Sequence, residues 1–213
     1  MTNETSRTRQ SLVAKLHRLG YEMPESEVFP PALAMAAIAR AKNLRPHMLV
    51  HPNCLPDLGV QSADWDAADS VILGDAADNF SYANMNAAFR ALIKSGGGDL
   101  YTLGRGKYYR EDGELTLDVG PYAAALEYAA SKEAVVVGKP SKDFFHAALM
   151  DMRVDAGDAV MVGDDVVSDV GGAQAAGLRD VVVTRSKDLQ CIQNQRNFST
   201  NCTVYLNPRS DQK

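Results

Sequence analysis

Three aspartates lie within six positions of one another, directly after a short apolar run. Asp164, Asp165 and Asp169 follow residues 159–162, Ala-Val-Met-Val, a pattern typical of a buried parallel strand. Open α/β sheets bind their ligands at the carboxyl ends of the strands. Three carboxylates this close would repel one another, and a hard cation with oxygen ligands, Mg²⁺ first, would relieve that repulsion. The alternative is one helix-capping aspartate and two solvated carboxylates.

A lysine holds the corresponding position one strand earlier. Residues 134–137, Ala-Val-Val-Val, predict a strand, and Gly138, Lys139 and Pro140 follow it. Pro140 fits the first turn of a helix, whose apolar face would contain Phe144, Phe145, Ala148 and Leu149. A lone lysine in a loop is usually solvated. A lysine beside an aspartate-rich turn instead suggests a phosphate held between an ammonium group and a metal.

These segments carry a resemblance to a known family. VVVGKPS (135–141) and VMVGDDVVSDVGGAQAAG (160–177) resemble motifs III and IV of haloacid-dehalogenase-type phosphatases in order, spacing and flanking strands. TNETSR (2–7) resembles motif II of the subgroup with a large cap between motifs II and III. Residues 79–92, 104–122 and 125–129 are similar to members that hydrolyse inorganic pyrophosphate. The resemblance runs from about Thr2 to Thr184.

The resemblance implies an α/β fold with two domains. A three-layer hydrolase core with a parallel sheet would comprise residues 1–42 and 131–185, and an inserted α/β cap would comprise residues 43–130. The last segment, 186–213, is rich in Gln and Asn and has little periodicity, so we expect a disordered tail. The resemblance also implies a homodimer formed through the cap.

The resemblance assigns roles to the residues singled out above. In the family, an aspartate from motif I attacks phosphorus and forms an aspartyl-phosphate. Thr2, Asn3 and Lys139 would hold the transferring phosphoryl group, with Lys139 also catalytic, and Asp164 would bind Mg²⁺. Asp165 and Asp169 would not contact the metal themselves but would orient metal-bound water or Lys139. The implied substrates are inorganic pyrophosphate and the P–N bonds of phospholysine and phosphohistidine, including phosphohistidine proteins.

Motif I itself has no counterpart in the sequence. It should lie some forty residues before Thr2, and the only similar run, Val-Ile-Leu-Gly-Asp-Ala at 71–76, falls in the expected cap. We therefore expect a truncated isoform, gene model or fragment with an incomplete core and impaired activity. The alternative is a non-catalytic isoform that binds the full-length enzyme. A receiver-like domain would also place aspartates at strand ends, but the cap-length insertion argues against it.

The elements that must position these residues can be located from the pattern. Residues 2–6 resemble a helix N-terminus, which could cradle a phosphate or simply cap the helix. The helix would bury Leu12, Leu16 and Leu19 and stop at Gly20. Ser168 or Asp169 would cap the helix after the aspartates, and Gly177 would end it. Further strands are expected at 47–51, 70–73 and 100–103, helices at 32–41 and 84–93, and a hairpin turn at Asp112-Gly113.

Several other features have weaker chemical interpretations. His47 and His51 are four residues apart, but prolines bracket them and the run is strand-like, so we interpret them as structural. Arg105 and Lys107 could face an anionic leaving group or be solvent-exposed. The segment at 104–109 lacks the third glycine of a nucleotide motif.

Composition excludes some classes of protein. The 213-residue chain has a net charge of −5 and no basic run, which disfavours nucleic acid binding. It has no apolar stretch of transmembrane length and no recognisable signal peptide, so we expect no membrane partner. Cys54, Cys191 and Cys202 show no metal spacing and are expected to be reduced thiols in a cytoplasmic, and secondarily nuclear, protein.

Overall fold

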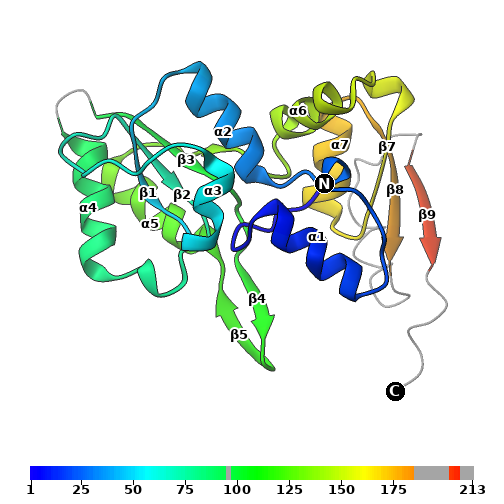
Figure 1. Ribbon diagram of the computed structural model, residues 1–213, viewed down its shortest axis with the longest axis horizontal. Coiled ribbons are helices and arrows are strands. Elements are labelled where there is room, and N and C mark those ends of the chain that lie inside the picture. Colours follow the sequence, from blue (N-terminus) through cyan, green and yellow to red (C-terminus); the bar gives the residue numbers. More distant parts are fainter. Residues whose placement is uncertain (95–96, 185–201, 207–213) are drawn as a thin grey trace. The chain divides into compact units, whose positions relative to one another are not determined.

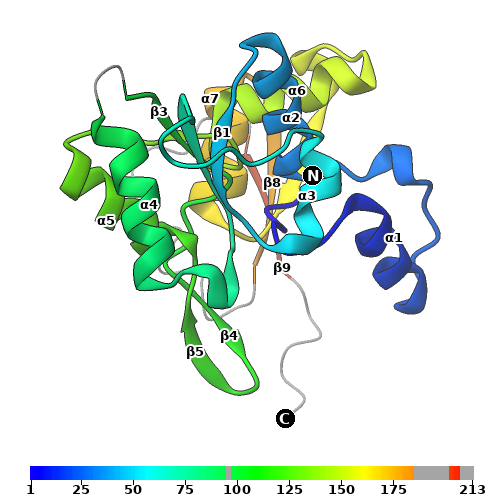
Figure 2. The same ribbon diagram turned by 60° about the vertical axis from the view of Figure 1, so that its left-hand side comes forward.

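The computed structural model describes residues 1–94, 97–184 and 202–206, with side chains up to residue 179. The chain divides into two compact units, Met1–Gly138 and Lys139–Lys213. Each unit combines a parallel sheet with helices (Figures 1 and 2). The expected α/β class is therefore confirmed. Each unit has its own parallel sheet.

A four-stranded parallel sheet forms the centre of the first unit. Its order is β1 (Pro46–Leu49), β2 (Ser70–Leu73), β3 (Asp99–Thr102) and β6 (Val135–Val136). All four residues of β2 are buried, as expected for a central parallel strand with both faces covered. The helices α4 (Tyr82–Ile93) and α5 (Val119–Ala130) pack on this sheet. Their apolar faces, which include Met85, Ala88, Phe89 and Leu92 of α4, join the core of this unit.

Three further helices of the first unit lie before or between its strands. They are α1 (Arg9–Arg18), the alanine-rich α2 (Pro31–Ala41) and the one-turn α3 (Leu55–Leu58). In α1, Leu12 is buried and Leu16 packs beside it, whereas Leu19 is 63% exposed. Gly20 follows the helix with φ +88°, a conformation that glycine adopts without strain. The predicted stop is thus confirmed, but the apolar face ends one turn earlier than expected.

A β-hairpin extends from the first unit, formed by β4 (Tyr108–Glu111) and β5 (Glu114–Leu117) (Figure 1). Its two turn residues, Asp112 and Gly113, both have positive φ angles of 48° and 90°. Two such residues suit a two-residue hairpin because the backbone twist matches that of the strands. The turn predicted from the sequence is confirmed.

The second unit contains a three-stranded parallel sheet in the order β7 (Val160–Gly163), β8 (Arg179–Thr184) and β9 (Cys202–Leu206). Helix α6 (Lys142–Met152) precedes β7, and its predicted apolar residues Phe144, Phe145, Ala148 and Leu149 are all buried. A π-helical turn (Val166–Gly171) and the short α7 (Gly172–Ala175) follow β7. Gly177, with φ +80°, ends this segment as predicted.

The structure corrects four local expectations. The first helix begins at Arg9 and is capped by Thr8, not by residues 2–6, because the side chains of that segment bind its own backbone instead. Pro140 precedes the N-cap Ser141 rather than lying in the first turn of α6. The strand after residue 159 is parallel but not buried, since Val160 is 47% and Val162 is 59% exposed. The expectation of a disordered tail is wrong for residues 202–206, which pair with β8.

The strand around residue 135 also has a different partner from the one expected. We expected residues 131–185 to form one core, but Val135 and Val136 pair with Tyr101 and Thr102 of β3. This pairing assigns them to the sheet of the first unit, whereas the next segment begins the second unit at Lys139. An apolar run indicates a strand and does not select its neighbour. The union of residues 1–42 with the second unit, and the cap at 43–130, stay predictions.

No helix among the described residues is long and apolar enough to cross a membrane. Cys54 is a free, fully buried thiol. The desolvation of this buried site raises the Cys54 pKa to about 12, so the group stays neutral at physiological pH. The side chains of Cys191 and Cys202 lie outside the described residues.

Candidate active site

In the turn after β7, the three aspartates make different contacts and have different structural roles. Asp165 is the N-cap of the following helical turn, and its Oδ1 accepts hydrogen bonds from the backbone N–H groups of Val167 and Ser168 at 2.9 and 2.7 Å. The sequence had suggested Ser168 or Asp169 for this role. Asp165 takes it because the helical turn begins three or four residues earlier than the pattern indicated, which leaves exposed N–H groups directly after Asp165.

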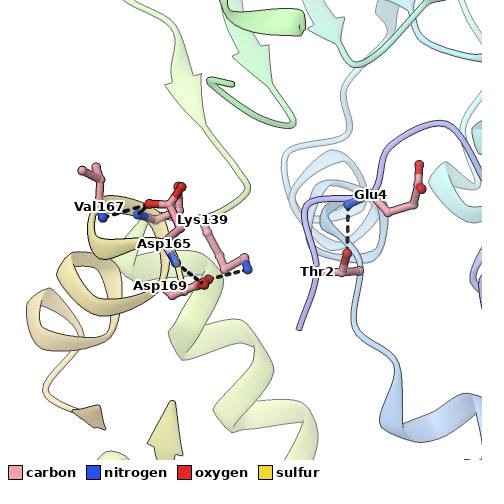
Figure 3. A network of polar contacts seen from close by, with 7 residues as sticks. Thr2, Glu4, Lys139, Asp165, Val167 and Asp169 are labelled. Atoms are coloured by element: carbon pink, nitrogen blue, oxygen red, sulfur yellow. Dashed lines mark hydrogen bonds and ion pairs between the residues drawn. The ribbon is translucent and has the colours of Figure 1, made fainter. Parts of the chain in front are cut away.

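Asp169 is buried and pairs with Lys139. The Lys139 Nζ lies 2.5 Å from the Asp169 Oδ1, and the two side chains are only 13% and 6% exposed (Figure 3). The other carboxylate oxygen accepts a hydrogen bond from the backbone N–H of Asp165 at 3.3 Å. A charged pair so shielded from water needs good geometry to offset its desolvation. This arrangement fixes the ammonium group next to the acidic turn, as the sequence predicted.

Gly163 provides the space for this ion pair. A Cβ atom at this position would overlap the Asp169 Oδ2, well inside van der Waals contact. Any larger residue at the end of β7 would therefore displace the buried carboxylate. A glycine is needed here because the Asp169 carboxylate lies so close to the backbone. Backbone conformation is not the reason, since the φ of Gly163 is not in the left-handed region.

Asp164 is the carboxylate that remains available. It is exposed, and none of the hydrogen bonds or ion pairs found among the described residues involves it. Among those residues, no group of three or more His, Cys, Asp or Glu side chains could hold a metal. Mg²⁺ nevertheless often binds through one or two carboxylates together with water and substrate phosphate. The donor set therefore fits a cation held by Asp164 and a bound phosphate.

The segment that resembles motif II forms a compact loop in the first unit. The Thr2 Oγ1 accepts a hydrogen bond from the Glu4 N–H at 3.1 Å, as drawn in Figure 3. Asn3 lies against Gly138, where a Cβ would come within 2.9 Å of the Asn3 Oδ1. Gly138 directly precedes Lys139 in the sequence. The motif II loop therefore packs against the residue before the candidate lysine. The joint phosphate site of Thr2, Asn3 and Lys139 stays a prediction.

A polar cavity of about 550 Å³ opens in the first unit beside Asn3. Its lining comes from the motif II loop, from α1, from the ends of β1 and β2, and from the hairpin. Of the lining residues, only Asn3 had been predicted to belong to a site, and His51 had been interpreted as structural. The others are, apart from Ala77, polar residues that no local motif marks as functional. The only available signal was their position after strands, such as Asp75 after β2. The full lining is Asn3, Glu4, Thr5, Ser6, Arg7, Lys15, His51, Asn53, Asp75, Ala77, Tyr109, Glu111 and Asp118.

Three other candidates have structural explanations. Arg105, considered for an anionic leaving group, donates a hydrogen bond from its Nη1 to the Glu127 Oε1 at 2.6 Å. Neither Arg105 nor Lys107 lines the cavity. The His47 Nδ1 lies 3.0 Å from the carbonyl oxygen of Ala63, consistent with a structural histidine. His51 accepts a hydrogen bond from the Asn53 N–H at 3.1 Å.

Comparison with known proteins relates these residues to a family. Residues 136–197 match a family model described as HAD-hydrolase-like, for haloacid dehalogenase. The chain is 47% identical over 186 residues to the phospholysine phosphohistidine inorganic pyrophosphate phosphatase of Danio rerio, covering 87% of this chain and 68% of that protein. It is 45% identical over 186 residues, with the same coverage, to the human protein of that name.

Solved structures show the same fold. The p-nitrophenyl phosphatase from Archaeoglobus fulgidus aligns with a TM-score of 0.86 and 26% identity over 95% of this chain and 80% of its own. NagD from E. coli K-12 aligns with a TM-score of 0.83 and 22% identity, over 95% and 80% of the two chains. The chain spans about two thirds, 68%, of the length of the curated relatives described above.

Proposed function

We propose that this chain, which belongs to the haloacid-dehalogenase-type phosphatases that include the phospholysine phosphohistidine inorganic pyrophosphate phosphatases, contributes a phosphoryl-binding site to a Mg²⁺-dependent hydrolase. The observation that carries the proposal is the buried Lys139–Asp169 pair at the turn bearing Asp164. An ammonium group fixed by a buried carboxylate needs no reorganisation when it binds an anion. The proposed substrates are pyrophosphate and N-phosphorylated lysine and histidine.

Each residue has one part in this proposal. Lys139 donates to the phosphoryl oxygens and offsets the negative charge that Asp164 and the substrate share. Asp169 holds the ammonium group in place, and Asp165 keeps the turn folded. Asp164 would hold Mg²⁺, which supplies charge stabilisation to the phosphoryl group when bound. Thr2 and Asn3 would complete the phosphate site.

Two further parts of the proposal concern this chain itself. We propose that it is impaired as an enzyme by itself, because the family's attacking carboxylate has no counterpart beside Lys139 among the described residues. The non-catalytic binding role is the second candidate. We propose a cytoplasmic, and secondarily nuclear, location from the lack of a disulfide pattern in its three cysteines. The homodimer stays a prediction.

Removing the lysine should weaken phosphate binding. Lys139→Ala is expected to lower the affinity for phosphate or tungstate by about 1–3 kcal/mol, the usual scale of a charge-assisted contact. Isothermal titration calorimetry measures the change. Lys142→Ala, which removes an exposed lysine at the start of α6, is the matched control. Equal affinity of Lys139→Ala and Lys142→Ala would show that Lys139 has no role in anion binding.

Metal binding should depend on Asp164. Thermal melts with and without millimolar Mg²⁺ should show stabilisation of the wild-type chain that Asp164→Asn abolishes, because the amide is a far weaker ligand for a hard cation. Asp112→Asn, in the hairpin turn, is the control and should keep the full shift. If both variants respond to Mg²⁺ equally, Asp164 is not the metal ligand.

A further inference from the structure

The motif II loop, residues 2–6, is braced by its own hydrogen bonds. The Thr2 Oγ1 accepts a hydrogen bond from the Glu4 N–H at 3.1 Å. The Glu4 Oε1 accepts the N–H and the hydroxyl of Ser6 at 2.8 and 2.6 Å, and two donors partly offset a charge that would repel a phosphate. Because Thr2 accepts through its oxygen, its hydroxyl hydrogen can still donate to a phosphate. These short-range bonds hold the shape of the loop without fixing its place in the unit.

Thr5 connects this loop to the sheet of the first unit. Its Oγ1 accepts a hydrogen bond from the backbone N–H of Asp75 at 3.1 Å, between residues 70 positions apart in the sequence. Thr5 is 6% exposed, whereas the other residues of the segment 1–8 are half-buried or exposed. A buried bond has a larger effect than a surface one, because water does not replace its acceptor when that is removed. The bond therefore fixes where the loop lies against the sheet.

The donor of this bond is held in place by the central strand β2. Leu73, its last residue, is fully buried, and its carbonyl oxygen accepts the Leu103 N–H at 2.8 Å. The next N–H, that of Gly74, donates to the carbonyl oxygen of Leu49 at 2.9 Å. The chain is thus bonded to its neighbours on both sides immediately before Asp75. The Asp75 N–H is a stationary donor, and the loop is the part that it positions.

A displacement of Thr5 would move the residues of the predicted phosphate site. Thr2 and Asn3 lie three and two positions before it, and even an extended chain advances only about 3.3–3.6 Å per residue. The bond between Thr2 and Glu4 keeps the loop together, so the loop would transmit such a shift rather than absorb it. Binding groups must be held within roughly 0.5 Å of their working positions. The Thr5 contact therefore affects how well the loop can hold a phosphate.

We propose that Thr5 is a positioning residue of the phosphate site, because its hydrogen bond with the Asp75 N–H fixes the motif II loop to the end of β2. The inference rests on the proposed function, which places the phosphoryl group at Thr2 and Asn3. Coupling between two equilibria is reciprocal. A phosphate bound by the loop should therefore stabilise the bond between Thr5 and Asp75, just as that bond favours phosphate binding.

The first test measures the affinity of the full chain for inorganic phosphate by calorimetry. Thr5→Val keeps the shape of the side chain but removes the acceptor, and it should weaken phosphate binding at least about fivefold, the factor that corresponds to one ordinary hydrogen bond. Thr5→Ser restores the hydroxyl and should bind phosphate nearly as well as the wild-type chain. Rescue by serine shows that the hydroxyl, rather than the packing of the side chain, is responsible.

Ser70→Ala is the matched control for a loss of stability. Ser70 lies at the opposite end of β2, is 1% exposed, and donates a hydrogen bond from its Oγ to the Asp69 Oδ1 at 3.0 Å. Ser70→Ala and Thr5→Val both remove a buried hydroxyl from the same unit, so both should lower the thermal midpoint. Phosphate affinity should fall in Thr5→Val alone. Unchanged affinity in Thr5→Val, or an equal loss in Ser70→Ala, would overturn the inference.

The second test needs no variant and measures amide hydrogen exchange in the wild-type chain. Phosphate at ten times its dissociation constant should slow exchange of the Asp75 N–H by about tenfold, because opening of its bond displaces the bound loop. The Met48 N–H is the control, since it also donates to a hydroxyl, the Ser62 Oγ at 3.0 Å, on the edge strand β1. Its exchange should change little. Equal effects on the two amides, or no effect on Asp75, would contradict the coupling.

The lysine variant separates this inference from the function on which it rests. If phosphate binds and depends on Lys139 but neither Thr5→Val nor the exchange of the Asp75 N–H shows an effect, the positioning role is wrong and the proposed phosphoryl site stands. If the wild-type chain does not bind phosphate, the proposed function fails and the inference fails with it. Circular dichroism of each variant verifies that folded chains are compared, and the exchange measurement decides the matter if Thr5→Val does not fold.

Discussion

A chain extended before Thr2, so that a strand ending in Asp-x-(Asp/Ser)-Gly lies some forty residues upstream, is expected to hydrolyse pyrophosphate at least about a thousandfold faster than the 213-residue chain alone. The added aspartate would supply the attacking carboxylate, while Lys139 and Asp164 stabilise the phosphoryl group. Without it, water must attack with only electrostatic help. Phosphate release, measured at equal concentrations of folded protein with millimolar Mg²⁺, gives both rates.

The added strand should also stabilise the second unit. β7 is an edge strand of the sheet formed by the described strands β7, β8 and β9, and Val160 and Val162 on it are about half exposed. We expect the new strand to pair with this edge and reduce that exposure, because open strand edges bind other strands readily. A rise in thermal midpoint should therefore accompany the gain in activity.

Two controls define what the comparison shows. Changing the added aspartate to asparagine should return the rate to that of the short chain while keeping the stabilisation. Asp75→Asn tests the other aspartate that follows a strand end, β2. Fast turnover by the short chain that Asp75→Asn abolishes would relocate the nucleophile to the first unit. An inactive long chain would instead favour the non-catalytic binding role.

Asp169→Ala is expected to lower the free energy of unfolding by about 3–5 kcal/mol, the cost of leaving one charge of a buried pair uncompensated. Lys139 and Asp169 are only 13% and 6% exposed, so water cannot replace the lost partner. The substitution also removes the acceptor of the Asp165 N–H. Chemical denaturation followed by circular dichroism measures the loss.

The neighbouring aspartates provide graded controls. Asp165→Ala removes an N-cap and should cost about 1 kcal/mol, whereas Asp164→Ala changes an exposed side chain and should stay within about 0.5 kcal/mol. Replacing Lys139 and Asp169 together by Met and Leu should recover much of the loss, because no lone charge remains. An Asp169→Ala cost no greater than that of Asp164→Ala would mean that the pair does not stabilise the fold.

Much of the fold could be predicted because it depends on near neighbours in the chain. The buried face of α6 follows from the helical spacing of residues 144, 145, 148 and 149. The hairpin turn follows from Asp112-Gly113, two residues that tolerate positive φ angles. Lys139 lies next to the acidic turn as predicted, although the strands before them, β6 and β7, belong to different sheets.

The assignment of roles among the aspartates required the tertiary structure. The sequence presented Asp164, Asp165 and Asp169 as a set of mutually repelling carboxylates that needed a cation. The fold instead neutralises Asp169 with Lys139 and uses Asp165 as a cap, which leaves Asp164 exposed and without a hydrogen bond or ion pair among the described residues. Lys139 pairs with Asp169, thirty positions away in the sequence. The local sequence pattern around the aspartates does not indicate which of them forms this pair.

Sequence pattern alone was sufficient for the family, the fold class, and most strands and helices. The folded chain was needed to establish that β6 pairs with β3, that Asp169 fixes Lys139, and that Arg7 and Glu111 line one cavity. The first group depends on side-chain periodicity and turn chemistry, which act within a few residues. The second depends on long-range pairing, where many partners satisfy the same local pattern and packing of the whole unit selects among them.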